Sequence, residues 1–166
     1  GMSDAVKAAG EGKLRRVLNT TSTNFGFLDF MAARGVGFEV VDYHYYERRG
    51  TSPRALAYGD GRTYDLFAKL ATYHRPVIIG EINGAEIYDA HYRDRLDDRL
   101  TIDGFRSLKT AIAQFAGQRD IRVEAIIVYE MWDEGHKAPP ENRFGLLREN
   151  GSPRLSLSIL TRFAKG

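Results

Sequence analysis

Cysteine is absent from this chain of 166 residues, which excludes a disulfide framework, a thiolate nucleophile and a cysteine-bound metal ion. Long apolar runs are absent too, because no stretch approaches the length that spans a bilayer. No signal peptide follows Met2, so the chain would be cytoplasmic as it stands, but its localisation stays open; we expect no membrane partner. Gly1 precedes this methionine like the remnant of a removed tag and is left out of the fold prediction.

A strong charge of either sign is also missing. The chain has 24 lysines and arginines against 22 aspartates and glutamates, and both signs are mixed along its length. Because the arginines are scattered and form no basic stripe, we expect no nucleic-acid partner. Hydrophobic residues make up 43% of the chain, which excludes a disordered protein. The length provides one sizeable core, so we predict a single domain over residues 2–166.

Strand-like and helix-like patterns alternate along the chain. Apolar and β-branched runs predict strands at 15–21, 38–46, 76–82 and 123–131. Amphipathic spacing predicts helices at 24–34, 64–73, 101–116 and 153–165, after the end of a shorter helix at 4–9. Glycines are expected to end the helices at 24–34 and 101–116, and Ser152 and Pro153 to cap and begin the last one. Strands that alternate with helices indicate a parallel sheet, so the fold class is α/β.

Two architectures are built from such units, an open doubly wound sheet and a closed (β/α)8 barrel. A dinucleotide-binding sheet carries a glycine-rich turn after its first strand. Here the residues after the first predicted strand include TTSTNFG, which weighs slightly against a nucleotide site. In barrel enzymes the chemistry lies at the C-terminal ends of the strands, so the ends of the predicted strands form the candidate site.

Glu81 occupies such an end in the stretch PVIIGEIN. Alternation of side chains along a strand predicts that Glu81 shares a face with Val77 and Ile79, and that Gly80 lies on the other face. A strand as apolar as this one is expected to be buried on both faces, which makes its terminal carboxylate conspicuous.

Polar and aromatic side chains also end the neighbouring strands. Alternation puts His44 and Tyr46 on one face of the second strand, and Glu130 and Trp132 on one face of the fourth. If these faces coincide, the side chains meet the carboxylate of Glu81 at one rim. A carboxylate beside a hydroxyl, an imidazole and an indole suits a sugar-cleaving pocket, because an indole offers a sugar ring an apolar platform.

Four stretches carry a resemblance to a known family. PVIIGEIN resembles the seventh strand of the clan A glycoside hydrolases, retaining (β/α)8 enzymes whose nucleophile is a glutamate at the end of that strand. DYHYY resembles their sixth strand, VYEMWDE their eighth, and RFGLLRENGSPRLSLSIL the exit into their last helix. RRVLNTTSTNFGFLDFMAARGVGFEVVDYHYY resembles strands five and six with the helix between them, so the resemblance covers almost the whole chain.

The resemblance implies a function and a set of site residues. It implies retaining hydrolysis of β-linked glycosides with Glu81 as nucleophile, a carbohydrate as substrate or ligand, and no cofactor or metal. Substrate-binding residues are then expected to be His44 and Tyr46, the platform Trp132, and Asn19 at the end of the first strand. The alternative interpretation of Trp132, the only tryptophan, is that it packs in the core, and the alternative for His44 is that it is a hydrogen-bonded structural histidine.

The resemblance covers strands five to eight only. The general acid/base of the family is a glutamate, usually after an asparagine, at the end of strand four, and no Asn-Glu pair ends a strand here. Retaining hydrolysis needs two carboxyls about 5–5.5 Å apart, so one is missing. We therefore expect half of a TIM barrel that a second copy or a complementary N-terminal half-barrel chain completes, unless the chain is a relic of a longer enzyme. In a homodimer, Glu130 of one copy would lie on the strand of the acid/base.

Other interpretations stay open. One is a non-catalytic carbohydrate-binding or assembly domain of the same ancestry, in which Glu130 is structural or binds substrate. Another is an unrelated flavodoxin-like α/β domain. The stretch HYRDRLDDRL at 91–100 combines histidine and acidic residues, but its arginines favour a salt-bridged loop over a metal site.

Overall fold

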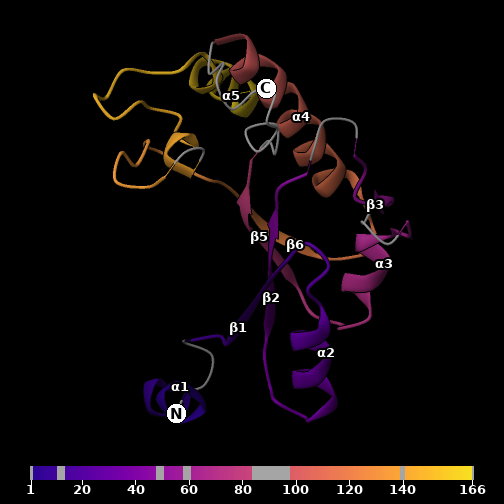
Figure 1. Ribbon diagram of the computed structural model, residues 1–166. Helices are drawn as coiled ribbons and strands as arrows, with labels where there is room; N and C mark the ends of the chain where they lie inside the picture. Colours follow the sequence, from indigo (N-terminus) through magenta and orange to yellow (C-terminus); the bar gives the residue numbers. More distant parts are fainter. Residues whose placement is uncertain are drawn as a thin grey trace.

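The computed structural model describes residues 2–10, 14–47, 51–57, 61–83, 98–138 and 141–165. Four strands form one parallel sheet in the order β1-β2-β5-β6 (Figure 1). They are β1 (Val17–Thr21), β2 (Val40–Tyr45), β5 (Val77–Ile82) and β6 (Val123–Val128). All four predicted strands are therefore present, and the predicted α/β class with a parallel sheet is confirmed.

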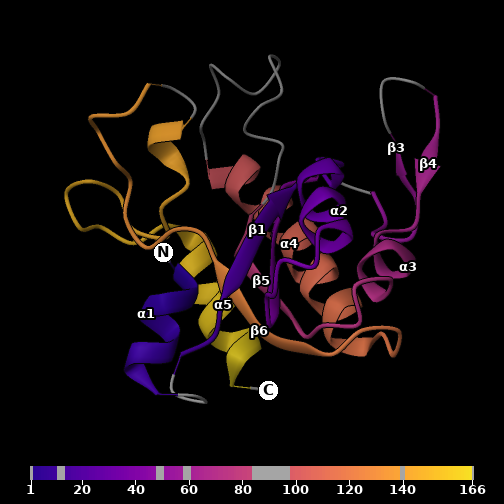
Figure 2. The same ribbon diagram turned by 90° about the horizontal axis from the view of Figure 1, so that it is seen from below.

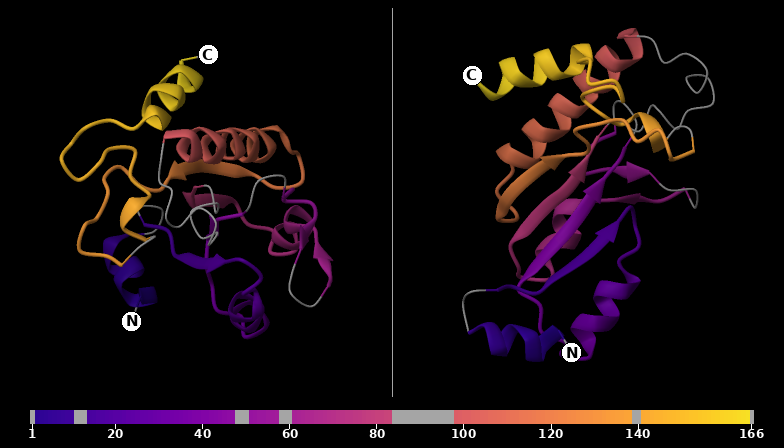
Figure 3. Two further views of the ribbon diagram at one scale, coloured as in Figure 1. Left: turned by 45° about the horizontal axis from the view of Figure 1, so that its top comes forward. Right: turned by 90° about the vertical axis from the view of Figure 1, so that its left-hand side faces the viewer.

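Five α-helices are described. They are α1 (Met2–Ala9), α2 (Gly26–Ala33), α3 (Leu66–Ala71), α4 (Asp98–Gly117) and α5 (Leu155–Ala164). Buried side chains from α2, α3 and α4 pack into one core with the strands, for example Leu28, Leu70 and Phe115. Figure 2 shows α2, α3 and α4 around the sheet, and Figure 3 shows α4 alongside β6 with α5 beyond it.

Three predicted helices, α2, α3 and α5, begin two residues later than expected. The helix predicted from residue 64 begins at Leu66, because β4 (Thr63–Tyr64) pairs with β3 (Leu56–Ala57) in a small antiparallel sheet. Asp65 caps it by accepting a hydrogen bond from the backbone nitrogen of Ala68 at 3.0 Å. The last helix begins at Leu155, because the Ser152 hydroxyl donates to Asn150 Oδ1 at 2.7 Å and the predicted cap does not form.

The fourth predicted strand is shorter than expected. It ends at Val128, and beyond it the chain pairs with a later segment that also contains a short 3-10 helix at Glu141–Arg143. The backbone nitrogen of Glu130 donates to Phe144 O at 3.3 Å, and that of Leu146 donates to Glu130 O at 2.9 Å. These bonds hold the residues after β6 against the segment that leads to α5.

The two faces of the sheet differ. In β2, Val41, Tyr43 and Tyr45 are buried against the helices, whereas Asp42 and His44 are only partly covered. Asn19 of β1 is exposed beside them. The face opposite α2, α3 and α4 therefore carries polar side chains.

A bulge in β5 corrects the predicted face of Glu81. The β2 partners of Ile78 and Glu81 are Asp42 and His44, so three residues of β5 span two of β2. The same extra residue appears against β6, where Ile79 and Ile82 pair with Ile126 and Val128. Both Ile79 and Ile82 are buried in the core. Glu81 therefore does not share the face of Val77 and Ile79, because the bulge turns it to the face of His44.

The outer strands of the sheet are open on one side. Within the residues that the structure describes, β1 pairs only with β2 and β6 pairs only with β5. None of the described helices is apolar enough over a sufficient length to cross a membrane.

Candidate functional site

A carboxylate with two neighbours lies where β5 ends. The Tyr46 hydroxyl donates a hydrogen bond to Glu81 Oε2 at 2.6 Å, and His44 Nδ1 lies 3.3 Å from the same oxygen. Among the described residues no hydrogen bond reaches the other oxygen, Oε1. The side chains of Glu81 and His44 are 30% and 23% exposed, so solvent or a ligand reaches them. The structure thus brings together three of the predicted site residues.

The tautomer of His44 follows from its other neighbours. The Asn19 amide nitrogen donates to Asp42 Oδ2 at 3.1 Å and lies 2.6 Å from His44 Nε2. An amide nitrogen only donates, so Nε2 is the acceptor and Nδ1 carries the proton. The ring therefore turns its protonated nitrogen towards Glu81 Oε2, 3.3 Å away. Asn19 therefore acts through His44, a link that its place on the first strand did not predict.

Asp42 explains the glycine before Glu81. A Cβ atom on Gly80 would lie 2.0 Å from Asp42 Oδ1, so no other residue fits there without moving the carboxylate. Asp42 Oδ2 lies 3.4 Å from His44 Nε2, and its Oδ1 is buried with no hydrogen-bond partner in the described structure. Asp42 and Glu81 thus lie on opposite sides of one imidazole ring.

Aromatic rings support Tyr46 from the side of β6. The Tyr46 ring lies 6.3 Å from the ring of Tyr129, edge to face, and 5.5 Å from that of Phe144. The Asn83 amide nitrogen donates to the backbone oxygens of Tyr129 and Phe144, which ties the end of β5 to this segment. Sequence reasoning did not include Tyr129 among the site residues. Its position directly after the end of β6 could have indicated it, because site residues were expected at strand ends.

Glu130 lies in a second cluster. Lys137 Nζ is 3.9 Å from Glu130 Oε2, pairs with Glu134, and donates to the Tyr129 hydroxyl at 2.6 Å. Burial raises the pKa of Glu130, while a hydrogen bond with Tyr129 and the charge of Lys137 oppose the rise. Its Oε1 is buried and has no hydrogen-bond partner among the described residues. No printed bond joins Glu130 to Glu81, so the structure places these carboxyls in separate clusters.

Trp132 does not join either cluster in the described structure. Its side chain is 53% exposed, and its backbone bridges to Leu147. No ring contact connects it to Tyr46 or Tyr129 among the described residues. Its role as a sugar platform stays a prediction.

The comparisons with known proteins find similarity among solved structures. No protein-family model matches the chain, and no curated protein does either. Among solved structures, xylanase B from Clostridium stercorarium F9 matches with a TM-score of 0.60 at 17% identity. The match covers 91% of this chain and 47% of the xylanase.

The chain has a glycoside hydrolase-like fold. The xylanase is a TIM barrel, and this chain spans about half of its length, so the predicted half-barrel architecture is confirmed. At 17% identity the likeness extends to the fold alone and leaves the roles of Glu81, His44, Tyr46 and Glu130 as predictions.

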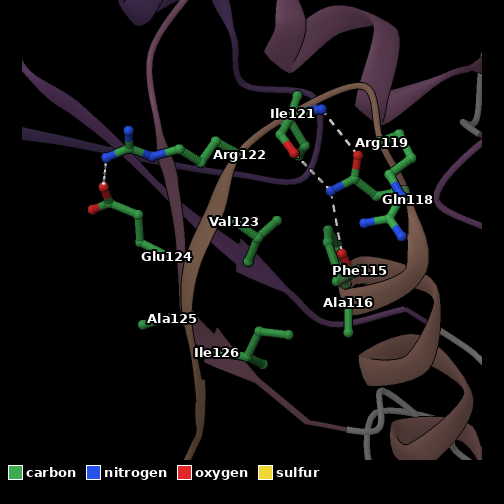
Figure 4. Close-up of a pocket in the computed structure, with 10 residues that line it drawn as sticks. All are labelled: Phe115, Ala116, Gln118, Arg119, Ile121, Arg122, Val123, Glu124, Ala125 and Ile126. Atoms are coloured by element: carbon green, nitrogen blue, oxygen red, sulfur yellow. Dashed lines mark hydrogen bonds and ion pairs between the residues drawn. The ribbon is translucent and has the colours of Figure 1, made fainter.

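A cavity of about 630 Å³ lies away from Glu81, between α4 and β6 (Figure 4). Its lining comes from the end of α4 and the start of β6, and includes Gln118, Arg119, Ile121 and Val123. Because all four sheet strands are parallel, the start of β6 lies at the opposite end of the sheet from Glu81. This cavity is therefore separate from the glutamate site.

The described residues hold no group of three or more histidine and acidic side chains arranged for a metal ion. The predicted salt-bridged loop at 91–100 lies outside the described residues over 91–97, and Asp98–Gly117 is α4.

Proposed function

We propose that this chain carries the nucleophile of a retaining β-glycosidase of clan A type, with Glu81 as that nucleophile. The observation that supports the proposal most is the hydrogen bond from the Tyr46 hydroxyl to Glu81 Oε2, with His44 Nδ1 3.3 Å from the same oxygen. These contacts orient a carboxylate at the C-terminal end of a parallel strand, where barrel enzymes carry their chemistry.

The chemistry follows from the geometry. Glu81 Oε1 attacks the anomeric carbon of a β-linked sugar and forms a glycosyl ester, while the bond from that carbon to the glycosidic oxygen breaks and the leaving alcohol takes a proton from a general acid. Water then attacks the anomeric carbon, gives its proton to the conjugate base of that acid, and returns the carboxylate of Glu81. Tyr46 and His44 lie against Oε2 during both steps, and the Asn19 amide, which also donates to Asp42, positions the imidazole.

A second function is favoured by one observation. Retaining hydrolysis requires a second carboxyl that acts as an acid. The other carboxyl near His44, that of Asp42, already accepts a hydrogen bond from the Asn19 amide and does not serve as that acid. A carbohydrate-binding or assembly domain of the same ancestry needs no such group. In that case a soluble glycan binds, Glu81→Gln leaves its affinity within a few fold, and no hydrolysis occurs.

The test of the catalytic proposal is hydrolysis of a panel of aryl β-glycosides by the wild-type protein and by Glu81→Gln. We expect the variant to lose at least about 10³-fold in kcat, because the covalent step has no nucleophile. Glu149→Gln makes the same chemical change at an exposed position and is the matched control. Equal rates for wild type and Glu81→Gln would contradict the proposal.

A further inference from the structure

The exposed apolar side chains gather at the two open flanks of the sheet. Nine large hydrophobic residues are exposed among those described. Five belong to the β1 flank, on β1, on α2 and in the adjoining loops: Leu14, Val17, Phe27, Phe30 and Val36. Four belong to the β6 flank, on β6, after it and at the start of α5: Ile127, Met131, Trp132 and Leu155. The elements between the flanks, β2, α3 and β5, contribute none.

The two flanks also carry opposite charges at the same level. Arg15 precedes β1, and Glu124 lies at the start of β6. The Arg15 guanidinium donates to Glu124 Oε2 at 2.7 Å across the sheet. This ion pair is made within one chain, so the case for contact between a β1 edge and a β6 edge rests on their exposed apolar side chains.

A second copy related by a two-fold axis along the strands would cover both open flanks at once. This symmetry places the β6 edge of one copy beside the β1 edge of the other, keeps every strand parallel, and joins two four-stranded sheets. The result has the eight strands of a TIM barrel, and this chain spans 47% of the barrel of the matching xylanase. Leu155 of one copy would then face the α2 side chains of the other.

We propose that a second copy of this chain closes the barrel and that the partner subunit's Glu130 is the general acid/base for Glu81. This proposal rests on the proposed function for its catalytic part. In the closed barrel the partner's β6 borders β1, and three strand positions separate it from β5. That arrangement supplies the carboxyl that each copy lacks beside its own Glu81.

The environment of Glu130 suits an acid. Its carboxyl is 14% exposed, one of its oxygens is buried without a partner, and burial raises its pKa. Tyr129, Glu134 and Lys137 are the titratable groups that face it. A glutamate with a raised pKa keeps its proton nearer to neutral pH, as a general acid requires.

The proposed hydrolysis takes place in two steps. Glu81 forms a bond to the anomeric carbon while the bond from that carbon to the glycosidic oxygen breaks, and this oxygen takes the proton of the partner's Glu130. Water then attacks the anomeric carbon and gives its proton to the partner's Glu130. The ester bond to Glu81 breaks, and its electron pair returns to the carboxylate.

The decisive experiment mixes two inactive variants, Glu81→Gln and Glu130→Gln, by co-expression, and assays an aryl glycoside with a poor leaving group. In a mixed dimer one site carries both substitutions and the other carries none. With random pairing, half the dimers are mixed, so we expect about a quarter of wild-type activity. A mixture as inactive as either variant, beside an active wild type, would overturn the proposal.

Two further readouts separate the possible failures. Light scattering must give wild type and both variants the mass of two chains; an active monomer overturns the inference and leaves the proposed function standing. A dimer that hydrolyses no glycoside overturns the proposed function and the acid role, while closure of the barrel is upheld. If Glu130→Gln does not fold, Glu130→Asp replaces it in the mixture. Glu130→Asp should lose only part of the activity, and its mixture with Glu81→Gln should recover some of that lost activity.

The leaving group distinguishes an acid from a structural residue. Glu130→Gln should lose far less activity on a dinitrophenyl glycoside than on a substrate with a poor leaving group, because a good leaving group departs without a proton. A structural role would lower both rates by the same factor, and that result would overturn the assignment of Glu130.

Discussion

At the scale of single residues, the site depends on which oxygen of Glu81 is held. Tyr46 and the imidazole of His44 both lie against Oε2, and no hydrogen bond from a described residue reaches Oε1. The Asn19 amide donates to His44 Nε2 and to Asp42 Oδ2, so Asp42 helps to position the amide and Nδ1 of the ring carries the proton. Contacts from three strands thus meet at the carboxylate of Glu81.

Removing the hydroxyl of Tyr46 tests this arrangement. A hydrogen bond to a charged group contributes about 1.5–3 kcal/mol, so Tyr46→Phe should lower kcat/KM by roughly 10- to 150-fold. Tyr73→Phe is the matched control, because the Tyr73 hydroxyl donates to the Asp29 carboxylate at 2.7 Å, far from the site in the fold. Steady-state kinetics on one aryl glycoside measure both variants. Equal losses in the two would show that the effect is not specific to Glu81.

At the scale of the elements, the sheet is held at its N-terminal end by Arg16 and Glu39. Glu39 precedes β2 and accepts hydrogen bonds from the backbone nitrogen of Arg16 at 2.6 Å and from its Nε at 3.0 Å. These bonds lower the pKa of Glu39 from 4.5 to about 2. The link fixes β1 against β2 and, with it, Asn19 against His44.

The lowered pKa predicts a pH dependence of stability. Because the folded state prefers ionised Glu39, the stabilisation is full above the unfolded pKa near 4.5 and is lost as the pH falls towards about 2. Glu39→Gln should therefore lower the free energy of unfolding at neutral pH, and the difference from wild type should shrink across that range. Urea unfolding at several pH values measures it, with Glu149→Gln as control. A difference that is constant with pH would contradict the prediction.

The sequence predicted the strands better than the faces of the strands. Apolar runs and helical spacing located all four strands and the parallel order, because those signals depend on local composition. Strict alternation misplaced Glu81, because it assumes an unbroken register, and β5 contains one extra residue. The approach of Gly80 to Asp42 depends on the neighbouring strand, which no pattern within one strand reveals. The two-residue strands β3 and β4 were too short to produce a pattern.

At the scale of the whole molecule, one flank of the sheet complements the other. Val17 at the β1 edge and Ile127 at the β6 edge are 41% and 52% exposed. Burial of apolar area contributes roughly 25 cal/mol per Å², so two such edges favour association along their whole length. The barrel, the acid and the nucleophile are then properties of two chains together.

A charge at the edge tests this association. If two copies close the barrel as proposed, Val17→Asp should convert the dimer to a monomer and abolish the proposed hydrolysis together with it, because a buried unpaired carboxylate is costly. Ala113→Asp introduces the same side chain at an exposed position of α4 and should leave both mass and activity unchanged. Light scattering and the glycoside assay on the same samples measure the outcome. An active monomeric Val17→Asp would show that closure is not required.

The central claim is that Glu81 becomes glycosylated. The most direct measurement treats the protein with an activated aryl glycoside in which fluorine replaces the hydroxyl beside the anomeric carbon, so that the intermediate is hydrolysed slowly. Peptide mass spectrometry then locates the sugar. We expect the sugar to be attached as an ester on the peptide that contains Glu81, and the loss of activity to be proportional to the extent of labelling. A label on another residue, or continued hydrolysis of substrate with no label on Glu81, would contradict it.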